Sequence, residues 1–140
     1  MKFFIRCLVF PTEDSELIMR SLLRFFPHSE FTISSGDRER WIEATSPNSE
    51  AIEKLRSIIH ELRIIDAVRR VVSKSWTGSM FTLRLDKQAA VRNKIRIIDE
   101  SDTPPLGSIE ITGFCESDEA YDSFLNWFTP PTKDGKIIKN

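Results

Sequence analysis

The chain has 140 residues, of which 40% are hydrophobic and 29% are charged, and its formal net charge is −1. These values fit a single folded domain with a sizeable core and exclude a disordered chain. No apolar run approaches the roughly 20 residues of a membrane-spanning helix, and Arg6 interrupts the apolar start, so we interpret that start as a strand. We expect a soluble, cytoplasmic protein without a membrane partner.

The small net charge conceals an uneven distribution along the chain. Residues 54–96 carry eleven Lys or Arg against three acidic residues, a net charge of +8, whereas the remainder has a net charge of −9. Concentrated cations suit phosphate contacts, because each cation near a phosphate releases counterions and adds affinity. The pI of about 6.1 is lower than that of most general nucleic-acid-binding proteins.

The first predicted element is a strand over residues 2–10, which is apolar at both odd and even positions. This pattern indicates a central strand that is covered on most of both faces. Pro11 ends the strand. Residues 12–14, Thr-Glu-Asp, supply N-cap chemistry and early acidic charge for a helix through Phe26.

Short strands and amphipathic helices follow. Residues 46–47, Ser-Pro, form a good N-cap and first-turn pair for a helical pattern that runs to about Lys74. A break within residues 62–66 would divide this pattern into two helices, and both forms stay open. Ser117 caps a last helix that ends near Phe128. Further strands are predicted over 30–34, 40–44, 80–85, 94–98 and 108–115, with a hairpin turn over 35–38 and a short helical turn within 87–93.

This order, β-α-β-β-α(α)-β-β-β-α, predicts an α+β domain over residues 1–129, with a mainly antiparallel sheet and helices packed on one face. Residues 130–140 begin with two prolines and are predicted to form a flexible tail. The apolar stripes predict a core built from Ile18, Leu22, Phe25, Phe26, Ile52, Leu55, Ile59, Leu62, Ile65, Val68, Val72, Phe81, Leu83, Leu85, Ala120, Tyr121, Phe124, Leu125 and Phe128.

Catalytic or metal-binding patterns are weak. His28 and His60 have no Ser, Cys or carboxylate neighbour at triad spacing, and the acidic residues 99–102 lack the spacing of a calcium loop. The glycines are scattered singly, which excludes a phosphate-binding loop. We therefore expect no enzyme activity, cofactor or metal. Cys7 and Cys115 allow either a disulfide or two buried free thiols, and we favour the free thiols.

The basic segment contains a helical repeat. Six residues spaced by four or three positions would share one face of a continuous helix: Arg56, His60, Arg63, Ala67, Arg70 and Lys74. Such a face is often only solvated, and here it could also pair with the acidic remainder of the domain. As RNA-binding candidates we select the side chains that could form one phosphate-contacting surface: Arg63, Arg69, Arg70, Lys74, Lys87, Gln88, Arg92 and Lys94.

Four segments resemble a family of small archaeal proteins. They are Pro-Thr-Glu-Asp at 11–14, Arg-Ile-Ile-Asp-Ala-Val-Arg-Arg-Val at 63–71, Leu-Asp-Lys-Gln-Ala-Ala-Val-Arg-Asn-Lys-Ile at 85–95 and Pro-Leu-Gly-Ser-Ile-Glu-Ile at 105–111. That family is labelled RNA-binding and, in part, a predicted exosome subunit. The resemblance implies a fold like that of the ribosomal large-subunit protein that contacts the small ribosomal RNA, or a double-stranded-RNA-binding-like fold.

The phosphate clamp of double-stranded-RNA-binding domains, Lys-Lys-x-Ala-Lys, has no match in this chain. Arg69, Arg70 and Lys74 are its nearest counterpart but differ in spacing. Our first hypothesis is thus a non-enzymatic RNA-binding protein, linked to RNA processing or the ribosome, with single- and double-stranded RNA both open. The alternative is a protein–protein adaptor or homodimer whose basic and acidic surfaces meet, in which Arg63 and Arg70 would contact carboxylates.

Overall fold

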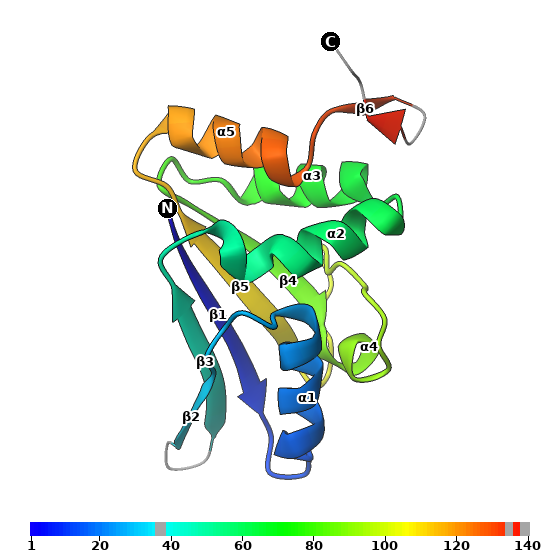
Figure 1. Cartoon of the computed structure of the whole chain (residues 1–140). Coiled ribbons are helices and arrows are strands. Elements are labelled where there is room, and N and C mark those ends of the chain that lie inside the picture. Colours follow the sequence, from blue (N-terminus) through cyan, green and yellow to red (C-terminus); the bar gives the residue numbers. More distant parts are fainter. Residues whose placement is uncertain (36–38, 134–135, 138–140) are drawn as a thin grey trace.

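The computed structural model describes residues 1–35, 39–133 and 136–137. A five-stranded antiparallel sheet has the order β2-β3-β1-β5-β4, and the helices lie over one of its faces (Figure 1). This arrangement confirms the predicted α+β class. The elements are β1 (Lys2–Val9), α1 (Ser15–Phe25), β2 (Thr32–Ser35), β3 (Arg40–Ser46), the 3-10 helix η1 (Ser49–Ile52), α2 (Glu53–Glu61), α3 (Ile65–Ser75), β4 (Met80–Asp86), α4 (Lys87–Val91), β5 (Ser108–Phe114), α5 (Asp118–Phe128), β6 (Thr132–Lys133) and β7 (Lys136–Ile137).

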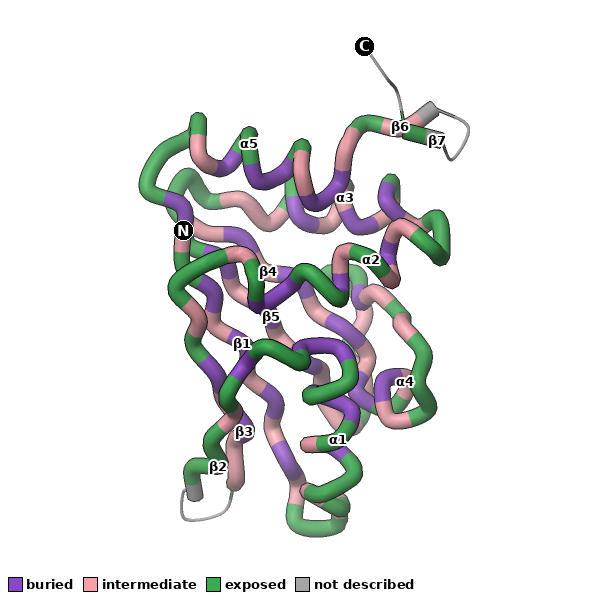
Figure 2. Tube along the Cα trace, in the orientation of Figure 1, coloured by how far each residue is buried: buried purple, intermediate pink, exposed green. Residues whose placement is uncertain are grey.

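The central strand β1 has one face in the core and one face that is partly open. Its odd-numbered residues from Phe3 to Val9 are buried beneath the helices, whereas Phe4, Arg6 and Leu8 are only half-buried. The same alternation runs along the neighbouring strands in Figure 2. The prediction that β1 is central is confirmed. The prediction that both its faces are mostly covered is wrong, because the helical layer covers the odd-numbered side.

Capping residues explain where several helices begin. The Asp14 carboxylate accepts a hydrogen bond from the Glu16 backbone N–H at 2.9 Å, and the Ser117 hydroxyl accepts one from the Ala120 N–H at 3.1 Å. Both N-caps were predicted. The predicted cap at Ser46 is wrong: β3 extends through that residue, and Asn48 instead caps η1 by accepting from the Glu50 N–H.

The predicted core residues are nearly all buried, and the exceptions are Leu62 and Ala120. Leu62 is 52% exposed because it follows the last turn of α2, where the chain leaves the helix. Ala120 is half-buried against the core.

An aromatic contact attaches α5 to the sheet. The Phe124 ring of α5 stacks on the Phe81 ring of β4 at a centroid distance of 5.1 Å.

Residues 94–98 form less of a strand than predicted. One antiparallel bridge joins Ile97 to Leu85, and backbone hydrogen bonds connect Arg96 to Asp86 and Ile98 to Arg84. The segment thus follows the outer edge of β4 briefly. Of the predicted turn over 35–38, residues 36–38 lie outside the described residues. In the predicted tail, β6 pairs with β7, and the Thr132 hydroxyl donates to the Asp66 carboxylate.

Candidate nucleic-acid interface

The long basic helix divides into α2 and α3, because the chain turns at residues 62–64. Arg63 adopts a left-handed conformation with φ of 57°. The Arg63 N–H donates to the His60 carbonyl and the Ile64 N–H donates to the Ile59 carbonyl, which together form a Schellman motif at the end of α2. Arg63 is exposed at this turn. The six spaced residues of the basic repeat therefore do not share the face of one helix.

Three side chains of the basic segment, Arg56, His60 and Arg69, contact the C-terminal end of α5. Arg56 Nε donates to the Trp127 carbonyl at 2.7 Å, and its guanidinium lies 4.9 Å from the centroid of the Trp127 ring. His60 Nε2 lies 2.9 Å from the Phe128 carbonyl oxygen, and Arg69 donates to the Thr129 carbonyl at 2.5 Å. The last carbonyls of a helix lack intrahelical donors and carry partial negative charge. Arg56, His60 and Arg69 therefore stabilise the packing of α5, and Arg69 has a structural role.

Lys87 is buried, with 1% of its side chain exposed. Its ammonium donates to the Leu8 carbonyl at 2.8 Å and to the Glu13 carboxylate at 2.6 Å, and it lies 5.1 Å from the centroid of the Phe10 ring. Glu13 also accepts from the Phe10 N–H at 3.0 Å. The structure therefore leaves no part of Lys87 for a phosphate contact.

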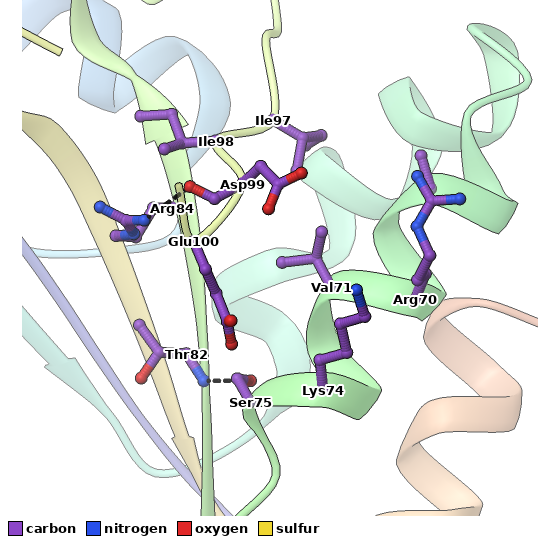
Figure 3. Close-up of a pocket in the computed structure, with 11 residues that line it drawn as sticks. Arg70, Val71, Lys74, Ser75, Thr82, Arg84, Ile97, Ile98, Asp99 and Glu100 are labelled. Carbon is purple, nitrogen blue, oxygen red and sulfur yellow. Dashed lines mark hydrogen bonds between the residues drawn. The ribbon is translucent and has the colours of Figure 1, made fainter. Parts of the chain in front are cut away.

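Arg70 and Lys74 are exposed on α3, at the rim of a cavity of about 300 Å³ between α3 and the outer edge of β4 (Figure 3). Asp99 and Glu100 line the same cavity. Arg84 donates to the Asp99 carbonyl at 2.9 Å. The site thus combines cations with carboxylates, which weakens its attraction for an anion.

Gln88, Arg92 and Lys94 are exposed around the end of α4. Asn93 has φ of 62°, and the Lys94 N–H donates to the Ala89 carbonyl, so this helix also ends in a Schellman motif. The turn directs the chain along the end of α1 and along α2, where Lys94 shares a cavity with Arg24 and Lys54. Gln88 and Arg92 line a further cavity of about 240 Å³ together with Glu13 and Asp14. The selected candidates therefore do not form one continuous surface.

Arg24 and Lys54 were missed as candidates. Arg24 lies outside the basic segment, and Lys54 falls outside the repeat that begins at Arg56. One sequence signal was present: Arg20 and Arg24 are four residues apart, so they share a face of α1.

Arg96, which the sequence places near this region, is paired with Asp86 and with Asp102. The hydrogen bond and charge of Asp102, followed by those of Asp86, raise the pKa of the Arg96 guanidinium.

The open face of the sheet carries charges of alternating sign. Strand register places Glu43, Arg6, Glu110 and Arg84 side by side across β3, β1, β5 and β4. Arg6 pairs with Glu110 at 3.2 Å, and its guanidinium lies 3.9 Å from the centroid of the Trp41 ring. Opposite charges in neighbouring positions cancel each other's field, so this face has little net attraction for a polyanion.

The cysteines are both buried and free, which confirms the favoured interpretation. Burial raises the pKa of the Cys7 thiol from 9.0 to about 12. Among the described residues, no group of three or more His, Cys, Asp or Glu side chains has the arrangement of a metal site. No helix in this part of the chain is long and apolar enough to cross a bilayer.

Together, these features define a small α+β protein with exposed cations on its helical side and charges of alternating sign on its open sheet face. The model of the RNA-binding family, described as RNA binding, matches residues 4–113, and the chain belongs to that family.

Relatives of similar length come from archaea. A UPF0201 protein of Sulfolobus acidocaldarius is 30% identical over 131 residues, which cover 94% of this chain and 88% of the relative. A UPF0201 protein of Thermococcus onnurineus is 29% identical over 137 residues, which cover 96% of this chain and 96% of the relative.

Solved structures share the fold. The crystal structure of a UPF0201 protein from Methanococcus jannaschii superimposes with a TM-score of 0.85 at 26% identity, covering 99% of this chain and 100% of that chain. A DUF54 protein from Sulfolobus solfataricus superimposes with a TM-score of 0.66 at 16% identity, covering 92% of this chain and 97% of that chain. The second likeness concerns the fold alone.

Proposed function

We propose that this protein binds RNA through contacts between exposed cations of its helical layer and the phosphate backbone. The supporting observation is that five candidate cations are exposed and take part in none of the ion pairs of the described residues: Arg63, Arg70, Lys74, Arg92 and Lys94. All five lie within the range matched by the RNA-binding family. A cation that holds no structural partner can exchange its counterions for a phosphate without loss of stability.

The protein would act by binding alone, as a non-enzymatic component in RNA processing or at the ribosome. Gln88 adds a neutral donor and acceptor beside Arg92. Arg69 and Lys87 are left out of the proposed surface, since one supports α5 and the other is buried. The adaptor hypothesis expects Arg63 and Arg70 on carboxylates. Those carboxylates would belong to a second copy or to an acidic partner, and Arg63 and Arg70 form no ion pair among the described residues of the single chain.

A salt series tests the proposal. Fluorescence anisotropy with labelled single-stranded and hairpin RNAs should give micromolar or tighter dissociation constants that weaken steeply as salt rises. Replacing both Arg70 and Lys74 by Gln should reduce the slope of log K against log salt by about one to two, since each phosphate contact contributes nearly one unit.

Lys2→Gln is the matched control, because Lys2 is an exposed cation at the start of β1 and outside the helical layer. Its slope should equal that of the unmodified protein. Absent binding, or binding that does not respond to salt, would contradict the proposal.

A further inference from the structure

A cavity of about 560 Å³ lies between α1, α2 and the segment that follows α4. Figure 1 shows these three parts of the chain next to one another in the helical layer. The volume falls within the roughly 300–1,000 Å³ of typical ligand pockets. Three cations line it from three different segments, namely Arg24, Lys54 and Lys94.

Its charge is of one sign. Of the residues that the structure describes, no acidic one lines this cavity, whereas Asp99 and Glu100 line the cavity beside α3. Arg24, Lys54 and Lys94 make none of the ion pairs or side-chain hydrogen bonds found among the described residues. Like charges around one cavity repel each other, so an anion placed between them would relieve this repulsion as well as attract each cation.

The rest of the cavity lining is largely aliphatic. Ile58, Leu62 and Ile95 contribute to it, and Leu62 is 52% exposed. The Schellman turns at the ends of α2 and α4 place Leu62 and Lys94 at the cavity, because each turn fixes the backbone next to these residues. Apolar surface beside three cations suits a ligand that carries a negative group next to a planar ring, because the faces of such a ring can pack against aliphatic side chains.

We propose that this cavity holds one unpaired nucleotide of an RNA strand, with its phosphate between the three cations and its base against the aliphatic side chains. The inference rests on the proposed function and narrows it to single-stranded RNA. In an A-form duplex the bases are paired and stacked, so a base cannot leave the helix to contact Leu62 without an unstacking cost. For an unpaired nucleotide this cost is much smaller.

Anisotropy titrations of the full chain with an unstructured single-stranded RNA, and with a blunt RNA duplex that is long enough to stay paired and carries the same total number of phosphates, test this inference. We expect the single strand to bind at least five-fold more tightly. Lys54→Gln combined with Lys94→Gln should weaken single-strand binding at least ten-fold and lower its salt slope. Leu62→Ala should weaken it about three-fold without changing the salt slope, since it removes apolar contact only.

Arg70→Gln combined with Lys74→Gln serves as the matched control, because it removes the same charge from the cavity between α3 and β4. The control should weaken binding less than the Lys54 and Lys94 pair. If RNA binds with a steep salt slope but the two pairs of substitutions have equal effects, or the duplex binds as tightly as the single strand, the inference is overturned while the proposed function stands. If no RNA binds, both are overturned.

Discussion

Lys87 is held in the core by two hydrogen-bond acceptors, the Leu8 carbonyl and the Glu13 carboxylate. Glu13 belongs to the Pro-Thr-Glu-Asp segment and Lys87 to the Lys-Gln-Ala-Ala segment, which are two of the four stretches that resemble the archaeal family. Their contact joins the end of β1 to the start of α4. In this chain, residues of two of these stretches thus meet in a buried structural ion pair.

Replacing Lys87 by Met should destabilise the protein by roughly 3 kcal/mol, because the buried partner of an ion pair loses its compensating charge. Urea denaturation measures this change. Adding Glu13→Gln to the first substitution should recover part of the loss, since no unpaired carboxylate remains. Lys94→Met is the control and should change stability by less than about 0.5 kcal/mol, as expected for an exposed side chain. Equal effects of the two lysine substitutions would contradict this account.

Because the Cys7 thiol is buried, we expect the folded protein to lose stability at alkaline pH. Its pKa is raised from 9.0 to about 12 by burial. The unfolded chain therefore releases the thiol proton at a lower pH than the folded chain. This contribution to stability is fully present below pH 9 and is lost as the pH rises toward 12, at up to about 1.4 kcal/mol per pH unit.

Denaturant titrations at several pH values above 9 should show that Cys7→Ala loses stability less steeply than the unmodified protein. Cys115 and the lysines titrate in both proteins, so they cancel in the comparison. Parallel pH profiles would contradict the prediction.

At the scale of elements, the turn between α2 and α3 decides which cations can act together. Arg63 occupies a left-handed position that glycine adopts more easily. Arg63→Gly should therefore preserve the turn and stabilise the fold by up to about 1 kcal/mol. Thermal unfolding followed by circular dichroism measures this effect. Arg63→Ala keeps the strain but also removes the charge, and it should show no gain.

The end of α5 gives a second test at this scale. Arg69→Met should lower stability by about 1–2 kcal/mol, because the Thr129 carbonyl loses a charged donor and the helix dipole loses a nearby cation. RNA affinity should change by less than two-fold. Lys74→Met should do the reverse, with little change in unfolding free energy and weaker RNA binding. If both variants lost RNA affinity to the same extent, the result would show that Arg69 also contacts the RNA.

Local patterns predicted most elements but not the partners of their side chains. Alternation over 80–85 predicted the buried faces of Phe81, Leu83 and Leu85, and capping chemistry predicted the start of α5, because these signals act within a few residues. Lys87 and Lys94 look alike in the sequence. Lys87 is buried and Lys94 is exposed, because Glu13, seventy-four positions away from Lys87 in the sequence, contacts Lys87 alone of the two. Contacts of this kind depend on the tertiary fold.

For the whole molecule, the two layers differ in what they offer to RNA. The helical layer carries several exposed cations that have no ion-pair partner among the described residues, among them Arg70, Lys74 and Lys94. On the open sheet face, Arg6 is already engaged by Glu110 and by the Trp41 ring. Aromatic residues on an open sheet can stack with bases in other RNA-binding folds, so Phe4 and Trp41 are the natural alternative contacts. Stacking on Trp41 would require the displacement of Arg6 from its ring and would leave the Glu110 carboxylate facing the RNA.

Ultraviolet crosslinking to a single-stranded RNA, followed by mass spectrometry, distinguishes the two faces. We expect crosslinked peptides from the end of α1, from α2 and from residues 92–95, and none from β1 or β3. Trp41→Ala should leave RNA affinity within about two-fold, because it removes a ring that binds an arginine rather than a base. Crosslinks concentrated at Phe4 and Trp41 would instead assign RNA binding to the sheet. In that case the cations of the helical layer would act only by long-range attraction of the RNA, over a Debye length of about 10 Å at 0.1 M ionic strength.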